Sequence, residues 1–138
     1  MNLAEKQQQL LEDLLLIEDA QERLSVIVAR AGKPPALTPE ERTDARRVPG
    51  CVSLVWLVPT ITDGRCHFRC EADSPVVRGL VQLLCELYSK CPPQEIVAVE
   101  PTLIEGLGLP RQLSPTRLNG LRSVRACIRD FAARQLHA

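Results

Sequence analysis

The N-terminal part of the chain carries apolar side chains at helical spacing. They recur every three or four positions among glutamate, glutamine and lysine: Leu3, Leu10, Leu11, Leu14, Leu15 and Ile17. This spacing predicts an amphipathic helix. After Glu18-Asp19, a second helical pattern runs over residues 24–28, and Gly32 is expected to end it. The first 32 residues therefore predict two consecutive helices.

The middle of the chain changes to a pattern typical of strands. Residues 52–58 are dense in β-branched and aromatic side chains, which predicts a buried strand. Asp63-Gly64 is typical of a tight turn. Residues 65–71 then alternate between polar and apolar side chains, and the apolar positions are Cys66, Phe68 and Cys70. The pattern predicts a β-hairpin with one buried face.

Proline marks the start of the other predicted helices. Ser74-Pro75 and Ser114-Pro115 each place a capping serine before proline, and a long apolar stripe follows both. Pro92-Pro93 opens a shorter helix, and residues 38–41 have the form of a capping box inside a long loop. The order of elements predicts an α+β fold in which helices cover a small antiparallel sheet of about three strands. We expect one domain, residues 1–138.

Composition and charge narrow the function classes. The chain has 138 residues, 45% hydrophobic and 25% charged, which is typical of an ordinary globular domain. Seventeen basic residues balance seventeen acidic ones, so the charge pattern of a general nucleic-acid binder is missing. The sequence shows no secretory signal and no apolar run long enough to span a membrane. We therefore expect a cytoplasmic protein with no nucleic-acid or membrane partner.

The charges are distributed unevenly along the chain. Residues 1–22 hold six acids and one base, whereas residues 107–138 hold six arginines and one acid. This asymmetry favours N-terminal and C-terminal helices packed side by side with complementary exposed faces. A docking surface for a charged partner is the alternative.

Five of the six cysteines have settings typical of structural residues or incidental thiols. Cys85 and Cys127 lie in predicted amphipathic helices, where cysteine fills apolar space. Cys66 and Cys70 are four apart, but alternation sends His67 to the opposite face and no second ligand pair has zinc spacing. Cys91 precedes two prolines and is expected to be exposed. We expect all thiols to be reduced and no metal to be bound.

Cys51 differs because it ends a polar loop directly before a buried strand. Gly50 lets the backbone bend closely behind it, and the strand fixes its base. No neighbouring histidine supplies a general base, so sulfur exchange with a persulfide suits this thiol better than hydrolysis. Two alternatives stay open: a stand-alone thiol enzyme using Cys51, and a scaffold module whose cysteines hold iron or zinc.

Several sequence blocks resemble one known family, the SufE-like sulfur acceptors of iron–sulfur cluster assembly. The blocks occur in family order and at family spacing: Gly50-Cys51-Val52-Ser53-Leu54-Val55-Trp56, Asp73-Ser74-Pro75-Val76-Val77-Arg78-Gly79-Leu80, Pro93-Gln94-Glu95-Ile96, Leu107-Gly108-Leu109, and Leu113-Ser114-Pro115-Thr116-Arg117-Leu118-Asn119-Gly120-Leu121. Together these motifs cover about the last two thirds of the chain. The N-terminal helices agree with the family in pattern only.

The resemblance implies a fold, a reaction and partners. The fold would be the α+β fold shared by SufE-like proteins and the IscU-type scaffolds. The reaction would be acceptance on Cys51 of sulfur from the persulfide of a SufS-like cysteine desulfurase, which the acceptor also stimulates. The sulfur would pass to a SufB-type cluster scaffold. The pyridoxal phosphate would belong to the desulfurase, so this chain, a monomer or weak homodimer, would need no cofactor.

The resemblance also implies roles for residues around Cys51. Arg117 matches the family's arginine in the Leu-Ser-Pro-x-Arg block and would contact the partner or favour the thiolate. Asp73 matches the acid before the central helix, where it either stabilises the helix start or restrains the cysteine loop. Gly50 and Ser53 would position that loop. Val52 departs from the family's usual glutamine, and Cys66, Cys70 and Cys91 match no family feature, which leaves open a second sulfur site or an incidental disulfide.

Overall fold

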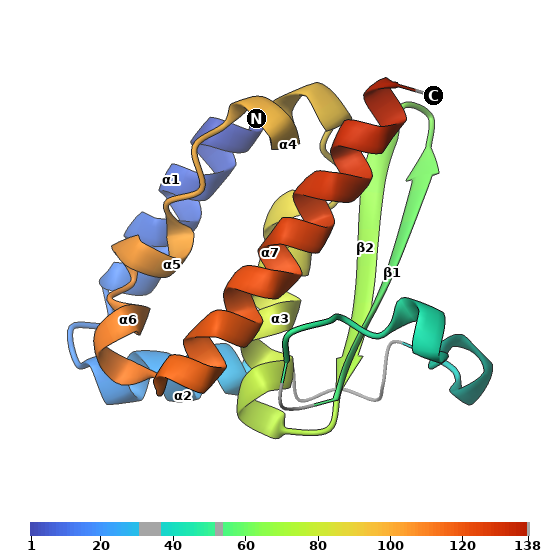
Figure 1. Ribbon diagram of the computed structural model, residues 1–138. Helices are drawn as coiled ribbons and strands as arrows, with labels where there is room; N and C mark the ends of the chain where they lie inside the picture. Colours follow the sequence, from blue (N-terminus) through green and yellow to red (C-terminus); the bar gives the residue numbers. More distant parts are fainter. Residues whose placement is uncertain (31–36, 52–53, 138) are drawn as a thin grey trace.

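Figure 1 shows the computed structural model of the chain, which describes residues 1–30, 37–51 and 54–137. The two predicted N-terminal helices are confirmed as α1 (Leu3–Leu15) and α2 (Ala20–Arg30). Asn2 caps α1 by accepting a hydrogen bond from the Glu5 backbone N–H at 2.8 Å. The predicted end of the second helix at Gly32 lies outside the described residues.

The predicted β-hairpin is confirmed. β1 (Val55–Thr62) and β2 (Arg65–Ala72) pair antiparallel, with Val55 opposite Ala72. Asp63 and Gly64 form the turn with φ of 53° and 74°, the positive values that a two-residue hairpin turn demands. β1 extends beyond the predicted segment to Thr62 because its last residues continue pairing with β2 on the solvent side.

The sheet of the described residues has two strands, where about three were predicted. Single residue pairs flank it instead, with Arg47 opposite Trp56 on β1 and Cys91 opposite Cys66 on β2. Neither flanking segment continues as a strand, because a 3-10 turn precedes Arg47 and a helix begins two residues after Cys91. The predicted α+β class is confirmed.

The remaining helices follow the predicted proline starts. In chain order they are α3 (Pro75–Tyr88), α4 (Pro93–Ala98), α5 (Leu103–Gly106), α6 (Leu109–Gln112) and α7 (Pro115–Leu136). Ser74 and Ser114 each accept a hydrogen bond from the backbone N–H three residues later, which caps α3 and α7. Two short 3-10 helices, η1 (Pro39–Glu41) and η2 (Asp44–Arg46), lie before Cys51.

α3 is the centre of the molecule. It packs on β2, on α2 and on α7, and Figure 1 shows α7 crossing in front of it with the hairpin on one side and α1 on the other. The inner face of β2 is apolar, as the alternation predicted, since Cys66, Phe68 and Cys70 are all buried. Phe68 meets Phe131 of α7 edge to face, with ring centroids 5.9 Å apart.

The expected side-by-side packing of the terminal helices is wrong. α1 packs against α3 and α5, and α7 packs against α4 and α3. The apolar stripe of α1 decides this arrangement, because burying Leu3, Leu11 and Leu14 outweighs attraction between exposed charges. Arg122 and Arg125 of α7 instead form ion pairs with Glu105 of α5.

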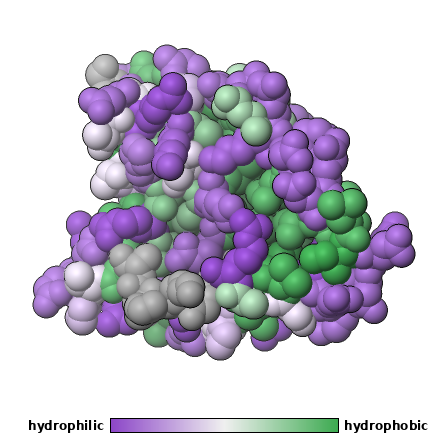
Figure 2. Space-filling model, turned by 180° about the vertical axis from the view of Figure 1, so that it is seen from behind, coloured by the Kyte–Doolittle hydropathy of each residue, from purple (hydrophilic) through white to green (hydrophobic). Residues whose placement is uncertain are grey.

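The surface is mostly polar, with apolar side chains gathered on one side of the face seen in Figure 2. The large apolar residues that are exposed in the described chain are Met1, Leu15, Leu16, Val26, Ile61 and Leu136. Among the described residues, no helix combines the length and the apolar character that crossing a membrane demands.

Candidate functional site

Cys51 lies on a loop that is folded back against β1 and α7. We define the cysteine loop as residues 37–51. The Val48 N–H donates to the Val55 carbonyl at 2.8 Å, and Arg47 forms its single bridge with Trp56. These contacts fix the loop at the point where the chain approaches Cys51. Figure 1 shows this segment passing beside the N-terminal half of α7.

Two glycines bring the loop and the helix together. Gly50 has φ of 81°, and a Cβ at this position would lie 2.9 Å from Ser123 Oγ of α7. The Cys51 thiol is half-buried and donates a hydrogen bond to the Gly120 carbonyl at 3.4 Å. A Cβ on Gly120 would lie 3.3 Å from Cys51 Sγ, closer than most carbon atoms approach. Gly120 therefore forms the seat of the thiol.

A small cavity of about 30 Å³ opens beside the Cys51 thiol. Most of its lining is apolar, and the lining residues are Cys51, Val55, Val77, Leu80, Val81, Thr116, Arg117, Gly120 and Leu121. Roughly 10–15 Å³ is enough for one water molecule. The cavity can therefore take one additional atom of about the size of sulfur next to Cys51.

Burial controls the protonation of Cys51. Removal from water raises the pKa of its thiol above the usual value, and nearby Cys127 adds to the rise. The charge of Arg47 opposes this rise. At neutral pH the resting side chain is therefore a neutral thiol, which is a weaker nucleophile than the thiolate.

Arg117 shares the Cys51 cavity, as the two residues both line it. It lies in the first turn of α7, where its backbone N–H donates to Ser114 Oγ at 3.3 Å. Its side chain is exposed. An exposed guanidinium at the rim of an apolar pocket is suited to binding an anionic group of an approaching partner.

The other residues singled out from the sequence lie around the base of the loop. The Asp73 N–H donates to the Leu54 carbonyl at 3.1 Å, which connects the end of β2 to the residues just before β1. The Asp73 side chain is exposed. Ser53 lies outside the described residues. The structure therefore places Gly50 and Cys51 of the loop against α7, where Arg117 lines the same cavity as Cys51. The Asp73 backbone is bonded to the residue just before β1.

Two site residues were missed by sequence reasoning. Arg47 acts on the pKa of Cys51 from within the cysteine loop, and Gly120 carries the seat of the thiol. Gly120 belongs to a motif that was recognised, so a glycine in the middle of a helix was an available signal. For Arg47 the sequence offers no signal, because its position depends on how the loop folds back.

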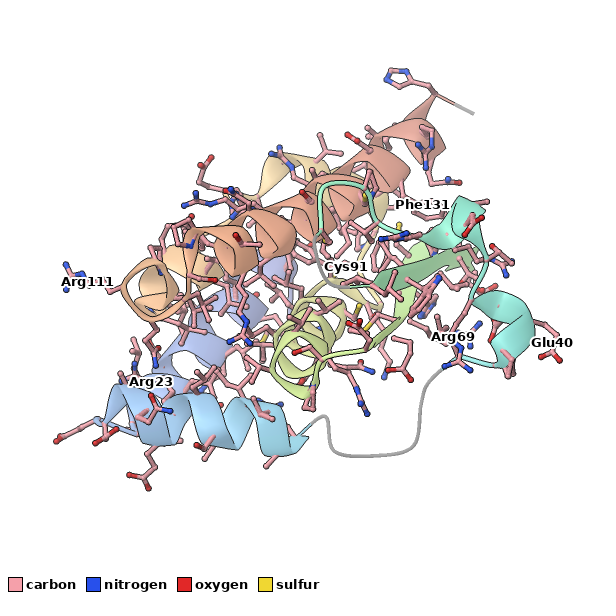
Figure 3. The ribbon with its side chains drawn as sticks, turned by 60° about the horizontal axis from the view of Figure 1, so that its bottom comes forward. Arg23, Glu40, Arg69, Cys91, Arg111 and Phe131 are labelled. Carbon is pink, nitrogen blue, oxygen red and sulfur yellow. The ribbon has the colours of Figure 1, made fainter. Side chains whose placement is uncertain are left out.

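The other cysteines divide into core and intermediate positions. Cys66, Cys70 and Cys85 are buried, as predicted, and Cys127 is half-buried on α7. The expected exposure of Cys91 is wrong, since only 5% of the residue is exposed. Its thiol turns inward and donates to backbone carbonyls of the preceding turn, and Figure 3 shows Cys91 within the body of the fold.

No metal site is formed by the described part of the chain. Nowhere in it do three or more histidine, cysteine, aspartate or glutamate side chains gather in a way that could hold an ion. The alternative of a metal-binding scaffold module therefore finds no set of metal ligands among the described residues.

Comparisons with known proteins give one consistent family. A family model described as "SufE: Fe-S metabolism associated domain" matches residues 8–132. A SufE-like protein of Rhizobium etli is 35% identical over 130 residues, which cover 90% of this chain and 87% of that protein. A SufE-like protein of Rhizobium meliloti is 32% identical over 135 residues, covering 94% and 96% of the two chains.

A solved structure shows the same fold. The solution structure of a hypothetical protein from Thermus thermophilus covers all of this chain and is fully covered by it, with a TM-score of 0.79. The two sequences are 23% identical, so this likeness concerns the arrangement of helices and strands.

Proposed function

Because the chain belongs to the SufE family of iron–sulfur metabolism, we propose that it is a sulfur-acceptor protein whose Cys51 takes sulfur from a cysteine desulfurase. One observation carries the proposal: the Cys51 thiol sits on Gly120 at the edge of a cavity with space for one more atom. The five other cysteines do not line this cavity.

The transfer step is an exchange between two sulfur centres. The donor is a persulfide on the active-site cysteine of the desulfurase. The Cys51 thiolate attacks the outer sulfur, a new S–S bond forms at Cys51, and the S–S bond on the donor breaks. The donor cysteine leaves as a thiolate and takes up the proton that Cys51 lost. No external oxidant or reductant is consumed.

The resting position of Cys51 protects the carrier between transfers. Burial raises the pKa of the thiol, which keeps it protonated and slow to react with stray electrophiles. When the Cys51 side chain moves into the active site of a desulfurase, its contact with Gly120 is lost. Its sulfur then lies near groups of the desulfurase that favour the thiolate. On return, the cavity accommodates the outer sulfur of the persulfide away from bulk water.

The proposed partners supply what this chain lacks. Pyridoxal phosphate, which releases sulfur from cysteine, is held by a SufS-like desulfurase, and a SufB-type scaffold receives the sulfur. Arg117 at the rim of the cavity and Asp73 before α3 are the proposed contact residues. Both residues are exposed and therefore accessible to a docking desulfurase. The protein acts in the cytoplasm as a monomer or weak homodimer and has no cofactor of its own.

Incubation with a cysteine desulfurase and free cysteine tests the proposal by intact-mass spectrometry. The wild-type chain is expected to gain one sulfur atom that dithiothreitol removes, and to increase sulfide release by the desulfurase. Cys51→Ser is expected to lose both effects. Cys127→Ser is the matched control, because Cys127 is also half-buried and also lies at α7.

Other outcomes identify the alternatives. Persistent gain of sulfur by Cys51→Ser would place the acceptor on another cysteine and overturn the proposal. Thiol-dependent turnover by wild type without a desulfurase would indicate a stand-alone enzyme. A stoichiometric metal in anaerobically purified protein, lost on replacing Cys66 or Cys70, would indicate a scaffold module.

A further inference from the structure

Cys66 and Cys91 lie opposite each other at the outer edge of β2. The Cys66 N–H donates to the Cys91 carbonyl at 2.8 Å, and the Lys90 N–H donates to the Cys66 carbonyl at 2.7 Å. The two cysteines form an isolated antiparallel bridge. Residues that face each other in this way have Cα atoms about 4.5–5.5 Å apart, inside the range of about 4.4–6.8 Å seen across disulfides.

Side chains of facing residues in an antiparallel pair point to the same side of the sheet. Both thiols are turned into the fold, since Cys66 is 0% exposed and Cys91 is 5% exposed. The two thiols also interact electrostatically. Burial raises the pKa of the Cys66 thiol, and the charge of Cys91 adds to the rise. The backbone thus places the two cysteines opposite each other, with both side chains buried.

The surroundings distinguish Cys91 as the thiol that reacts first. Two cations are hydrogen-bonded to the turn that precedes it: Lys6 Nζ donates to the Ser89 carbonyl at 2.9 Å, and an Arg65 guanidinium nitrogen donates to the Lys90 carbonyl at 2.8 Å. Burial raises the pKa of the Cys91 thiol and the charge of Glu95 adds to the rise, whereas the charges of Lys6 and Arg65 oppose it. Neighbouring cations stabilise a thiolate. Among the described residues, no cation is a cause of the shift in the Cys66 pKa.

We propose that Cys91 and Cys66 are a redox pair that closes to an intramolecular disulfide when a small peroxide reaches Cys91. Hydrogen peroxide suits a nearly buried thiol because it is neutral and close to water in size. The Cys91 thiolate attacks one peroxide oxygen, the O–O bond breaks, and protonation gives Cys91 sulfenic acid and one water. The Cys66 thiol then attacks that sulfur, the S–O bond breaks, and a second water leaves.

The disulfide would fasten the start of β2 to the turn between α3 and α4. The closed ring would contain nearly all of β2 and the whole of α3, and α3 supplies Val77, Leu80 and Val81 to the cavity beside Cys51. Cross-linking this segment restricts the unfolded chain and stabilises the folded protein. The device is separate from sulfur acceptance and does not depend on the proposed function of Cys51.

Peptide mapping tests the pair directly, because trypsin places every cysteine of this chain in a different peptide. The six peptides are 48–65, 66–69, 70–78, 79–90, 91–111 and 126–129. After treatment with hydrogen peroxide, the folded protein is expected to lose the mass of two hydrogen atoms per chain. Peptides 66–69 and 91–111 are expected to appear as one linked species that dithiothreitol separates. The thermal midpoint is expected to rise in the oxidised protein.

Single variants separate the steps of this reaction. Cys91→Ala is expected to abolish the linked species, and Cys66→Ala is expected to leave Cys91 as a sulfenic acid that dimedone traps. Cys85→Ala is the matched control, since Cys85 is a buried cysteine of α3 outside the pair. A wild-type protein that stays folded in peroxide and forms no link, or links other peptides, would overturn the proposal. Because this measurement uses the wild-type protein, it tests the proposed disulfide even where a variant fails to fold.

Discussion

The cysteine loop and the frame formed by β1, β2 and α3 hold their thiols in opposite ways. In the frame, Cys66, Cys70 and Cys85 are buried members of the hydrophobic core. In the loop, Cys51 rests on α7 through one weak hydrogen bond to Gly120 and stays half-exposed. Under the proposed function, the difference teaches that the sulfur-accepting thiol belongs to the loop, whereas the buried thiols of the frame belong to the core.

The largest effect is expected where the frame itself is broken. Leu84→Ala removes a side chain of α3 that is 2% exposed and is expected to lower the free energy of unfolding by roughly 2–5 kcal/mol, because it leaves a cavity. Urea unfolding followed by the fluorescence of Trp56, the single tryptophan, measures this loss. At urea concentrations too low to unfold the variant, Cys51 of Leu84→Ala should be alkylated at the same rate as Cys51 of wild type. A much faster rate would show that loop and frame are not separable.

The seat of Cys51 can be blocked without breaking the frame. Gly120→Ala places a Cβ 3.3 Å from Cys51 Sγ, and crowding of this kind costs about 1–3 kcal/mol in a packed site. The thiol is therefore expected to shift outward and to react with iodoacetamide roughly fivefold faster or more.

Stability separates this effect from damage to the fold. Alanine is a better helix former than glycine by about 0.5–1 kcal/mol, which offsets part of the crowding cost, so Gly120→Ala should lose no more than about 2.5 kcal/mol of unfolding free energy and stay folded. Asn119→Ala, at an exposed neighbouring position, should leave the alkylation rate unchanged. Equal rates for the two variants would contradict the proposed role of Gly120.

The pH dependence of alkylation sharpens the contrast between resting and released Cys51. Burial raises the pKa of the thiol, so the thiolate forms only at a pH above the usual value of about 8.5. The rate of labelling of peptide 48–65 should rise with pH through this raised pKa in the folded protein. In the urea-unfolded chain, the pH midpoint of the labelling rate should fall to the ordinary thiol pKa. A folded midpoint below that of the unfolded chain would refute the role of burial.

The smallest effect on stability is expected from the ion pair at the outer end of the cysteine loop. Glu41 of η1 forms an ion pair with Arg69 of β2, and the hydrogen bond from Arg69, helped by one from the Thr38 backbone N–H, lowers the pKa of the Glu41 carboxyl to about 2. Because the folded pKa is depressed, the stabilisation is complete at neutral pH and is lost as the pH falls through about 2. Figure 3 shows Arg69 close to this turn.

Arg69→Gln tests this tether. The Glu41 pKa is expected to return toward its ordinary range, which carbon-detected NMR titration measures. An unchanged Glu41 titration would exclude Arg69 as the cause of the shift.

Elements with local signals could be predicted from the sequence. The hairpin followed from alternation and Asp63-Gly64, and the starts of α3 and α7 followed from Ser-Pro pairs. Each of these signals acts within a few residues of the chain, so no knowledge of the tertiary structure was needed. The Gly-Cys motif likewise drew attention to Cys51, and the structure places this residue beside Arg117.

Features that depend on packing could not be predicted in this way. Charge asymmetry suggested paired terminal helices, but burial of the α1 stripe against α3 and α5 prevailed. Arg23 is 8% exposed, although arginine is rarely buried, because its guanidinium donates to the Leu14 and Ile17 carbonyls at the end of α1. Cys91 is buried because its turn pairs with Cys66, a contact 25 residues away along the chain.

The most direct measurement locates the transferred sulfur on the wild-type chain. After one turnover of a cysteine desulfurase with isotopically labelled cysteine, peptide mapping without reductant should find the labelled sulfur on peptide 48–65, which contains Cys51 alone among the cysteines. Label on the peptide of any other cysteine, or no label on a folded chain that binds the desulfurase, would contradict the account.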